Sequence, residues 1–227
     1  TGVFCDDSNS RVIKLDLNSI SLSTDFGSVS THLLSLEFLS SVSLSDTNIS
    51  GLIQGFSYCS KFVSEIDLSR NLISGSVFDV NYLSSCSSLK SLNLSFNLLD
   101  SSGVLKSGFG FSLKSLDLSG NQIVDERALP WIVSNGCGSL SYLAMKGNKL
   151  VGSFNLDNCS SLEYLDISSN NFSNNVPNFN ANLSHLDISS NKFTGNIEES
   201  LANCGSLAFL NVSNNVFTGG FPTLPKS

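Results

Sequence analysis

The chain of 227 residues is short of charge and of long apolar runs. Only 14% of its residues are charged, and the net charge is -7 with a pI near 4.6. Proteins that bind nucleic acids present a basic surface to the phosphates, so this balance argues against that class of partner. No run of 18 apolar residues occurs, which excludes a membrane-spanning helix within this sequence. The opening residues TGVFC carry no secretion signal, and we expect any such signal to lie outside this sequence.

Patterns that bind metals are scarce as well. The sequence has six Cys but no Cys-x-x-Cys pair, and its two His, His32 and His185, are not close to any Cys in the sequence. Zinc sites are usually built from such clusters. We therefore predict that the chain binds no metal ion and no other cofactor.

The sequence is filled instead by Ser, Asn and Leu in a recurring phrase, with 47 Ser and 25 Asn. LDISSNNFSN at 165–174 returns as LDISSNKFTG at 186–195 and as LNVSNNVFTG at 210–219. The shared template is L-x-x-L-x-L-x-x-N-x-L, and its first apolar residue is called repeat position 0 below. Nine copies begin at Val12, Leu39, Val63, Leu89, Leu113, Leu140, Leu162, Leu183 and Leu207.

The spacing of the template predicts the fold. Repeat positions 3 and 5 are apolar in all nine copies, and residues two apart point to the same side of a strand. Successive copies should therefore place short strands side by side in a parallel sheet, with positions 0, 3, 5 and 10 filling the interior behind it. We predict an α/β solenoid of about nine repeats, with this sheet on its concave face and each turn contacting only its neighbours.

Repeat position 8 is Asn in seven of the nine copies, and Ile20 and Thr47 replace it in the first two. The chain must turn sharply after each strand, which leaves backbone groups buried, and an Asn side chain offers both an acceptor and donors to them. We predict a structural ladder of Asn71, Asn97, Asn121, Asn148, Asn170, Asn191 and Asn215. After position 10 several copies continue with Gly or Asn, as in GSV at 75 and NNVP at 174, which suits a bend with positive φ.

The phrase is that of the leucine-rich repeat. The Gly-containing tail resembles the plant-specific subtype, which forms a right-handed superhelix with a second short strand. The strings LLSLEFLSSVSLSDTNISG, SNGCGSL and FPTLPKS are similar to the first repeats of plant receptor kinases of the brassinosteroid-receptor branch. This resemblance implies one domain over 1–227, in which 1–11 are the remnant of an N-terminal cap and 12–227 are repeats. We expect the chain to be cut from a longer protein at both ends.

The resemblance also implies a function. The segment would be a non-catalytic recognition or scaffold part of a receptor on the extracellular face of the plasma membrane, with the Ser/Thr kinase domain outside this chain. Such receptors bind the steroid in an island between later repeats, which is absent here, so a steroid would bind only the parent protein. A protein or peptide ligand or a co-receptor could contact this segment. The alternatives are a secreted inhibitor of cell-wall enzymes and a receptor-like protein in immunity.

Five of the six cysteines share a register, three or four residues before repeat position 0. Such a register favours small buried structural residues, because free Cys is often buried in this way. The alternative is that register neighbours form disulfides, since adjacent turns lie near the required distance. The pairs would then be Cys59 with Cys86 and Cys137 with Cys159, leaving Cys204 and Cys5 unpaired.

Six Asn-x-Ser sequons are candidates for N-glycosylation: Asn48, Asn93, Asn158, Asn171, Asn182 and Asn211. Their number is what chance predicts for this composition, so it does not indicate secretion. Asn93 and Asn211 occupy repeat position 4, which should face outward from the sheet on the concave side. Sugars there would obstruct that face, and we expect any concave contact to avoid those two turns.

The remaining outward positions suggest two further hypotheses. Position 4 is Asp in five copies, and Asp166 and Asp187 fall on adjacent strands, where paired carboxylates could perform acid–base catalysis. We favour the simpler reading that Asp is common beside Leu in this phrase, so no enzyme is predicted. Position 2 ends in four rings, which are either cross-strand stacking or a surface for a protein partner. These candidate contact residues are Tyr142, Tyr164, His185 and Phe209.

Overall fold

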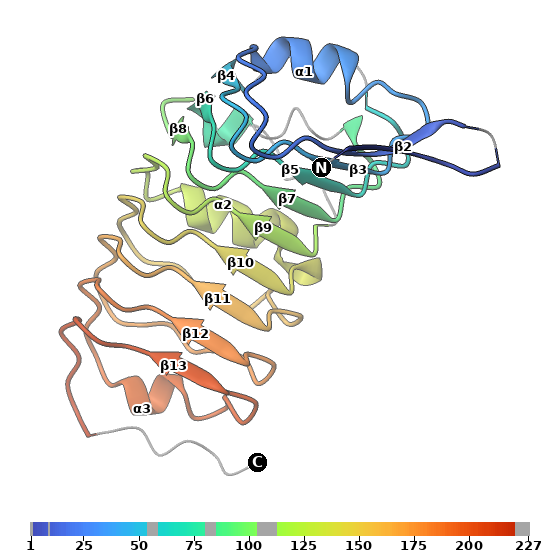
Figure 1. Cartoon of the computed structure of the whole chain (residues 1–227). Helices are drawn as coiled ribbons and strands as arrows, with labels where there is room; N and C mark the ends of the chain where they lie inside the picture. Colours follow the sequence, from blue (N-terminus) through green and yellow to red (C-terminus); the bar gives the residue numbers. More distant parts are fainter. Residues whose placement is uncertain (1, 9, 54–58, 80–84, 104–112, 221–227) are drawn as a thin grey trace.

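The computed structural model describes residues 2–8, 10–53, 59–79, 85–103 and 113–220 (Figure 1). Its main feature is a ten-stranded sheet with the order β1-β2-β3-β5-β7-β9-β10-β11-β12-β13. Figure 1 shows these strands as a row of arrows that follows the chain from the N-terminal to the C-terminal end. The order of the strands along the sheet is the order along the chain, so each turn of the solenoid adds one strand beside the last. The predicted repeat architecture with a long parallel sheet is confirmed.

Every repeat places its strand at the same point of the template. Eight strands cover repeat positions 2 to 4, and β2 covers positions 0 to 4. Neighbouring strands pair position by position, as in Leu143 with Leu165 and Leu165 with Leu186. The strands are β2 Val12–Asp16, β3 Ser41–Ser43, β5 Glu65–Asp67, β7 Ser91–Asn93, β9 Ser115–Asp117, β10 Tyr142–Ala144, β11 Tyr164–Asp166, β12 His185–Asp187 and β13 Phe209–Asn211.

This constant register stacks like residues in the interior. Leu116, Leu143 and Leu165 occupy position 3 of successive turns, and none of them is exposed. Burying a leucine side chain contributes roughly 1.5–3 kcal/mol relative to leaving it in water. One continuous apolar core therefore runs through the described turns, with Phe172 and Phe193 stacked at 5.7 Å at position 10 of two of them.

The asparagines of position 8 form the ladder that connects successive turns. Asn121 Oδ1 accepts the Leu99 backbone N–H of the preceding turn at 3.0 Å, while Nδ2 donates to the carbonyls of Leu94 and Leu118, also at 3.0 Å. The other six asparagines repeat this pattern across their own pair of turns. In the second copy the Thr47 hydroxyl donates to the Leu44 carbonyl at 2.8 Å instead. Among the described residues, no buried side-chain nitrogen or oxygen lacks a hydrogen-bond partner.

A second, shorter sheet lies beside the first (Figure 1). It has the order β4-β6-β8, with β4 Ser50–Leu52, β6 Leu72–Ser76 and β8 Leu98–Asp100. The bend at repeat position 12 has positive φ at Gly75 (102°) and also at Asn174 (69°), where Asn replaces Gly as expected. A Cβ on Gly75 would meet the Ile53 backbone nitrogen at 3.4 Å, an ordinary contact distance, so it is the dihedral angle that favours Gly at this position.

A left-handed residue precedes the ladder position in all nine turns. Repeat position 7 has φ between 54° and 66° whatever its side chain: Ser19, Asp46, Arg70, Phe96, Gly120, Gly147, Ser169, Ser190 and Asn214. Most non-Gly residues avoid this region at a cost of about 1–2 kcal/mol. The solenoid imposes it because this bend turns the next residue, the ladder asparagine, into the interior.

The connections on the far side of the sheet vary between turns. Helix α1, Phe26–His32, is capped by Asp25, whose carboxylate accepts the Ser28 N–H at 2.9 Å. Helix α2, Ala128–Gly136, continues into the 3₁₀ turn η2, Cys137–Ser139, and α3, Ile197–Ser200, forms one turn. At the N-terminal end, β1 Gly2–Cys5 pairs antiparallel with β2.

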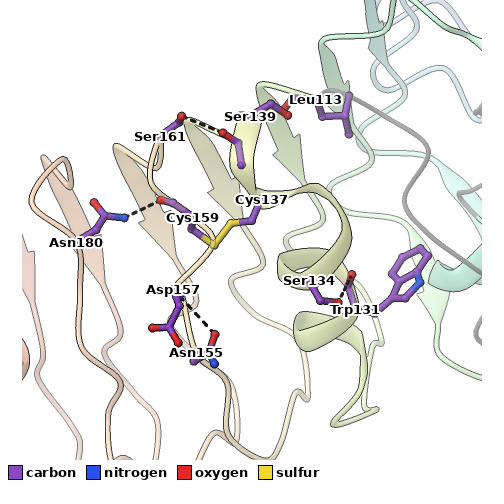
Figure 2. The surroundings of a disulfide bond; sticks show 11 residues. Leu113, Trp131, Ser134, Cys137, Ser139, Asn155, Asp157, Cys159, Ser161 and Asn180 are labelled. Atoms are coloured by element: carbon purple, nitrogen blue, oxygen red, sulfur yellow. Dashed lines mark hydrogen bonds between the residues drawn. A yellow bond between two sulfur atoms is a disulfide. The ribbon is translucent and has the colours of Figure 1, made fainter.

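Two disulfides join successive turns on this side. Cys59 bonds Cys86 with 5.0 Å between their Cα atoms, and Cys137 bonds Cys159 with 4.7 Å (Figure 2). The structure therefore differs from the interpretation favoured above, in which all the register cysteines were free and buried. The reason is geometric: equal register on neighbouring turns brings the Cα atoms within the range that a disulfide requires. Figure 2 also shows Asn180 Nδ2 donating to the Cys159 carbonyl at 2.8 Å, one turn further along.

Replacing Asn121 by Ala should destabilise the chain by roughly 1–3 kcal/mol, because backbone groups of two turns would lose their partner inside the core. Urea unfolding of the variant measures this loss. The matched control is Gln122→Ala, at the next residue, whose side chain is exposed. Equal stability of the two variants would contradict the ladder.

Thiol counting tests the disulfides. Titration of the unreduced, denatured chain should find two thiols, from Cys5 and Cys204, and six would mean that no disulfide forms. In the folded chain only exposed Cys5 should react promptly, because Cys204 is buried and this burial raises the pKa of its thiol to about 11.

Candidate recognition surface on the long sheet

The side of the long sheet that presents repeat positions 2 and 4, called the open sheet face here, carries a continuous stack of rings. Tyr142 and Tyr164 lie 4.2 Å apart between ring centroids and Tyr164 and His185 lie 4.1 Å apart. His185 and Phe209 follow at 4.1 Å, with only 5° between their planes. The parallel strands set this spacing, because residues in register sit one strand apart and their rings can lie face to face.

The stack combines an apolar body with polar edges. Phe209 is 44% exposed, while the other three rings are half-buried by their neighbours. Burial is the first cause that raises the pKa of both Tyr142 and Tyr164, and the carboxylates of Asp117 and Asp166 add to it. Both phenols are therefore neutral at physiological pH and act as hydrogen-bonding groups on a largely apolar surface.

Beside the rings runs a row of carboxylates at repeat position 4. Asp16, Asp67, Asp117 and Asp166 occur on every second strand from β2 to β11, and Asp187 follows on β12. All five accept the backbone N–H two residues later through Oδ1. The distance is 2.9 Å for Asp67 and Asp117, 3.0 Å for Asp166 and Asp187, and 3.5 Å for Asp16. Position 4 therefore has a structural task, closing the turn after the strand.

This task accounts for the carboxylate pair considered above for catalysis. Asp166 and Asp187 are paired across β11 and β12 and are each only 8% exposed. Each Oδ1 accepts a serine hydroxyl at 2.6 Å, from Ser168 and Ser189 respectively. The geometry is that of two turn-closing residues, which supports the simpler reading. Within the described residues no group of three or more His, Cys, Asp or Glu could hold a metal ion.

The N-terminal half of the open sheet face is polar and hollowed. A groove of about 480 Å³ extends from Lys14 to Tyr142. Lys14 is the cation in its lining, and the acidic groups are Asp16, Glu65, Asp67 and Asp117. Burial is the main cause that raises the pKa of Asp117, and repulsion from Asp166 and Asp67 raises it further. The open sheet face thus changes along the solenoid from an acidic groove to an aromatic stack.

The six sequons divide into two groups. Asn48, Asn158, Asn171 and Asn182 are exposed, whereas Asn93 and Asn211 are half-buried on the open sheet face. Asn211 Nδ2, the atom that would carry a sugar, donates to Asp187 Oδ2 and Ser189 Oγ at 3.1 Å. Glycosylation of all six remains a prediction. The half-burial of Asn211 together with these bonds disfavours a sugar there in the folded chain, whereas Asn48 and Asn182 also donate through Nδ2 but are exposed.

The family named Leucine Rich Repeat matches residues 161–181 and 182–204, and a second family of the same description matches 85–106 and 111–126. Two curated plant proteins are similar over most of the chain. Protein BRASSINOSTEROID INSENSITIVE 1 of Arabidopsis thaliana is 44% identical over 177 residues, which are 78% of this chain and 14% of that protein. The Brassinosteroid LRR receptor kinase of Solanum lycopersicum is 47% identical over 183 residues, 79% of this chain and 15% of that protein. The chain thus spans about a seventh of these relatives.

Solved structures are similar in fold. A plant ice-binding protein is 26% identical with a TM-score of 0.74, covering 98% of this chain and 78% of that one. The plant peptide hormone receptor RGFR1, in complex with RGF2, is 27% identical with a TM-score of 0.68, covering 86% of this chain and 31% of that one. No helix in the described part of the chain has the length and hydrophobicity to cross a membrane.

Replacing Asp117 by Asn should stabilise the chain at neutral pH. The folded-state pKa of Asp117 is raised, so its ionised form destabilises the fold, and this penalty appears as the pH rises through that pKa. Repulsion across about 10 Å costs about 0.4 kcal/mol per neighbouring carboxylate in water, so the gain should be modest. The substitution should not disturb the turn, because an Asn already closes the equivalent turn of the preceding repeat. There Asn93 Oδ1 accepts the Ser95 N–H at 3.0 Å.

Urea unfolding at two pH values measures this effect. The stability advantage of Asp117→Asn over the unaltered chain should be larger at pH 7 than near pH 3, where an Asp side chain is mostly protonated. Asp157→Asn is the control, because Asp157 is exposed on the far side of the sheet. An advantage that grows toward acid pH would contradict the assignment.

Proposed function

We propose that this chain, a leucine-rich-repeat domain similar over most of its length to plant brassinosteroid receptor kinases, is an early segment of a receptor ectodomain. In this role it extends the solenoid and presents the open sheet face to a protein or peptide partner. The observation that carries the proposal is the sequence similarity to two such receptors, which extends well beyond the generic repeat phrase.

The segment itself would perform no chemistry. Its paired carboxylates are occupied in closing turns, and its most distinctive surface is a stack of rings, which suits contact with another molecule. In the parent receptor a kinase domain outside this chain would transmit the signal. A steroid would be bound by later repeats, since this chain has no insertion between its repeats.

An extracellular position agrees with the cysteine chemistry. Disulfides persist in oxidising compartments and are rare in the cytosol, and two of them join neighbouring turns here. The exposed sequons Asn48, Asn158, Asn171 and Asn182 would be accessible to glycosylation on such a protein. We therefore propose that the segment lies on the outer face of the plasma membrane, as part of an anchored receptor.

A chimeric receptor tests this role. The corresponding segment of the tomato brassinosteroid receptor kinase would be replaced by this chain and expressed in plants that lack the receptor. We expect the chimera to reach the plasma membrane and to restore the growth response to brassinosteroid, because the solenoid would continue without a break. A chimera carrying both Asn121→Ala and Asn170→Ala is the control and should fail to accumulate, because its ladder is broken.

Two results would contradict the proposal. One is a chimera that accumulates at the membrane but gives no response to the steroid. The other is inhibition of cell-wall hydrolases by the purified chain at the concentrations at which secreted inhibitors act, which would favour that alternative. A chimera that also carries Tyr164→Ser and His185→Ser distinguishes a scaffold from a contact surface. If the segment is only a scaffold, this variant should still restore the growth response. If the rings contact a partner, the response should be lost.

A further inference from the structure

One window of the open sheet face carries carboxylates and rings side by side. On β9 and β11, Asp117 and Asp166 are separated by the Ala144 position of β10, so their Cα atoms lie about 9.6 Å apart, two strand spacings. The rings of Tyr142, Tyr164 and His185 come two residues before position 4 on β10, β11 and β12. A molecule lying across these strands would meet a charged row and an aromatic row together.

The sequons mark the limits of this window. Asn93 lies in β7, the strand before it, and Asn211 lies in β13, the strand after it. The four strands between them, β9 to β12, have no sequon on the open sheet face. A ligand there would remain accessible even if a sugar occupied either flanking strand.

The charges in the window are unbalanced. Lys114 and Lys146 are exposed near its rim, as is the acidic Glu163. Among the described residues, no ion pair within 4 Å joins a lysine to Asp117, Asp166 or Asp187. The window is therefore negative and half-apolar, and it complements a ligand that is basic and half-apolar.

The spacing of the carboxylates favours one backbone conformation of a bound peptide segment. A polyproline II helix has three residues per turn and rises about 3.1 Å per residue, so residues three apart share a face at about 9.3 Å. That repeat agrees with the separation of alternate strands. In an extended β-strand the residues of one face recur at about 6.6–6.8 Å, which matches neither one nor two strand spacings.

We propose, building on the recognition role above, that this window binds a basic proline-rich segment of a partner protein in the polyproline II conformation. Lys or Arg at every third residue would pair with Asp117 and Asp166 through Oδ2, because Oδ1 of each closes its turn, with Asp187 at the end of the row. The prolines between them would pack on the outer edges of the rings of Tyr142, Tyr164 and His185, whose faces are covered by one another in the stack.

Three synthetic peptides of equal charge test the proposal against the full, disulfide-bonded chain by fluorescence anisotropy at low salt. The probe has three Lys-Pro-Pro triplets. One control has three Lys-Gly-Gly triplets and lacks the stiff helix, and the other has three Lys-Pro-Pro-Pro quartets, which move each Lys off the shared face. We expect the probe to bind roughly fivefold more tightly than either control, and a Glu-Pro-Pro version to show no binding.

Variants locate the site. Asp166→Asn should weaken probe binding roughly fivefold and Tyr164→Ser roughly tenfold, by removing a charge and a ring. Both replacements occur naturally at these repeat positions, as Asn93 and Ser115, so the turns should still fold. The matched controls are Asp157→Asn and Phe96→Ser, an exposed acid and an exposed ring outside the open sheet face, and neither should change the affinity.

The proposal is overturned if the three lysine peptides bind equally, if the probe does not bind, or if only the control variants weaken binding. Thermal unfolding of each variant accompanies the titrations. A Tyr164→Ser chain that unfolds earlier but binds the probe unchanged would show that the stack serves the sheet alone. Failure of the peptide would leave the receptor role standing, because the chimera tests that role with no peptide present.

Discussion

The hydrogen bonds of the asparagine ladder are the constraint on which the rest of the structure depends. Each turn leaves carbonyls and an N–H inside the molecule, and one amide side chain serves the groups of two turns at once. A buried amide left without partners costs several times what a surface hydrogen bond contributes. The ladder therefore fixes the path of the chain after each strand and the offset between turns, and the apolar core packs within that frame.

Because the ladder and the core are the same in every turn, the side chains on the open sheet face can differ from turn to turn. Repeat positions 3 and 5 are buried in the interior, whereas position 2 requires only a side chain that tolerates an extended strand, and position 4 in most turns also supplies the oxygen that closes the turn. Position 2 accordingly changes from Lys14 and Glu65 at one end to Tyr164 and Phe209 at the other without altering the register. A solenoid of this kind separates folding from recognition: the same short strand is built nine times, and each copy carries a different surface.

Much of this architecture could be predicted from the sequence. The spacing of the apolar residues indicates the strands, and the recurring Asn at position 8 indicates the interior hydrogen bonds. The positions of the nine parallel strands of the long sheet and of the ladder asparagines follow from the template, whereas β1 and its antiparallel pairing with β2 do not. The left-handed bend at position 7 does not, because Arg70 and Phe96 occupy it as readily as Gly120. The surrounding turn imposes the positive φ on whatever residue stands there, so the bend cannot be predicted from the residue type at position 7. The cysteine pairs were ambiguous for a similar reason, since a shared register suits a buried filler and a disulfide equally well.

The candidate surface was predictable in its residues but not in its geometry. Four rings at position 2 are visible in the sequence, while their parallel stacking at 4.1–4.2 Å depends on the register of the strands. The acidic row is more informative still. Where position 4 closes the turn after the strand it does so with an acceptor oxygen, and Asn93 provides that oxygen as well as Asp117 does. The turn at Asn93 thus closes without a negative charge, and at Asp117 burial raises the carboxyl pKa, so the charge there does not stabilise the fold. The proposal that this surface recognises a partner therefore rests on its charge pattern, an acid on every second strand beside half-buried and exposed rings, and not on any requirement of the fold.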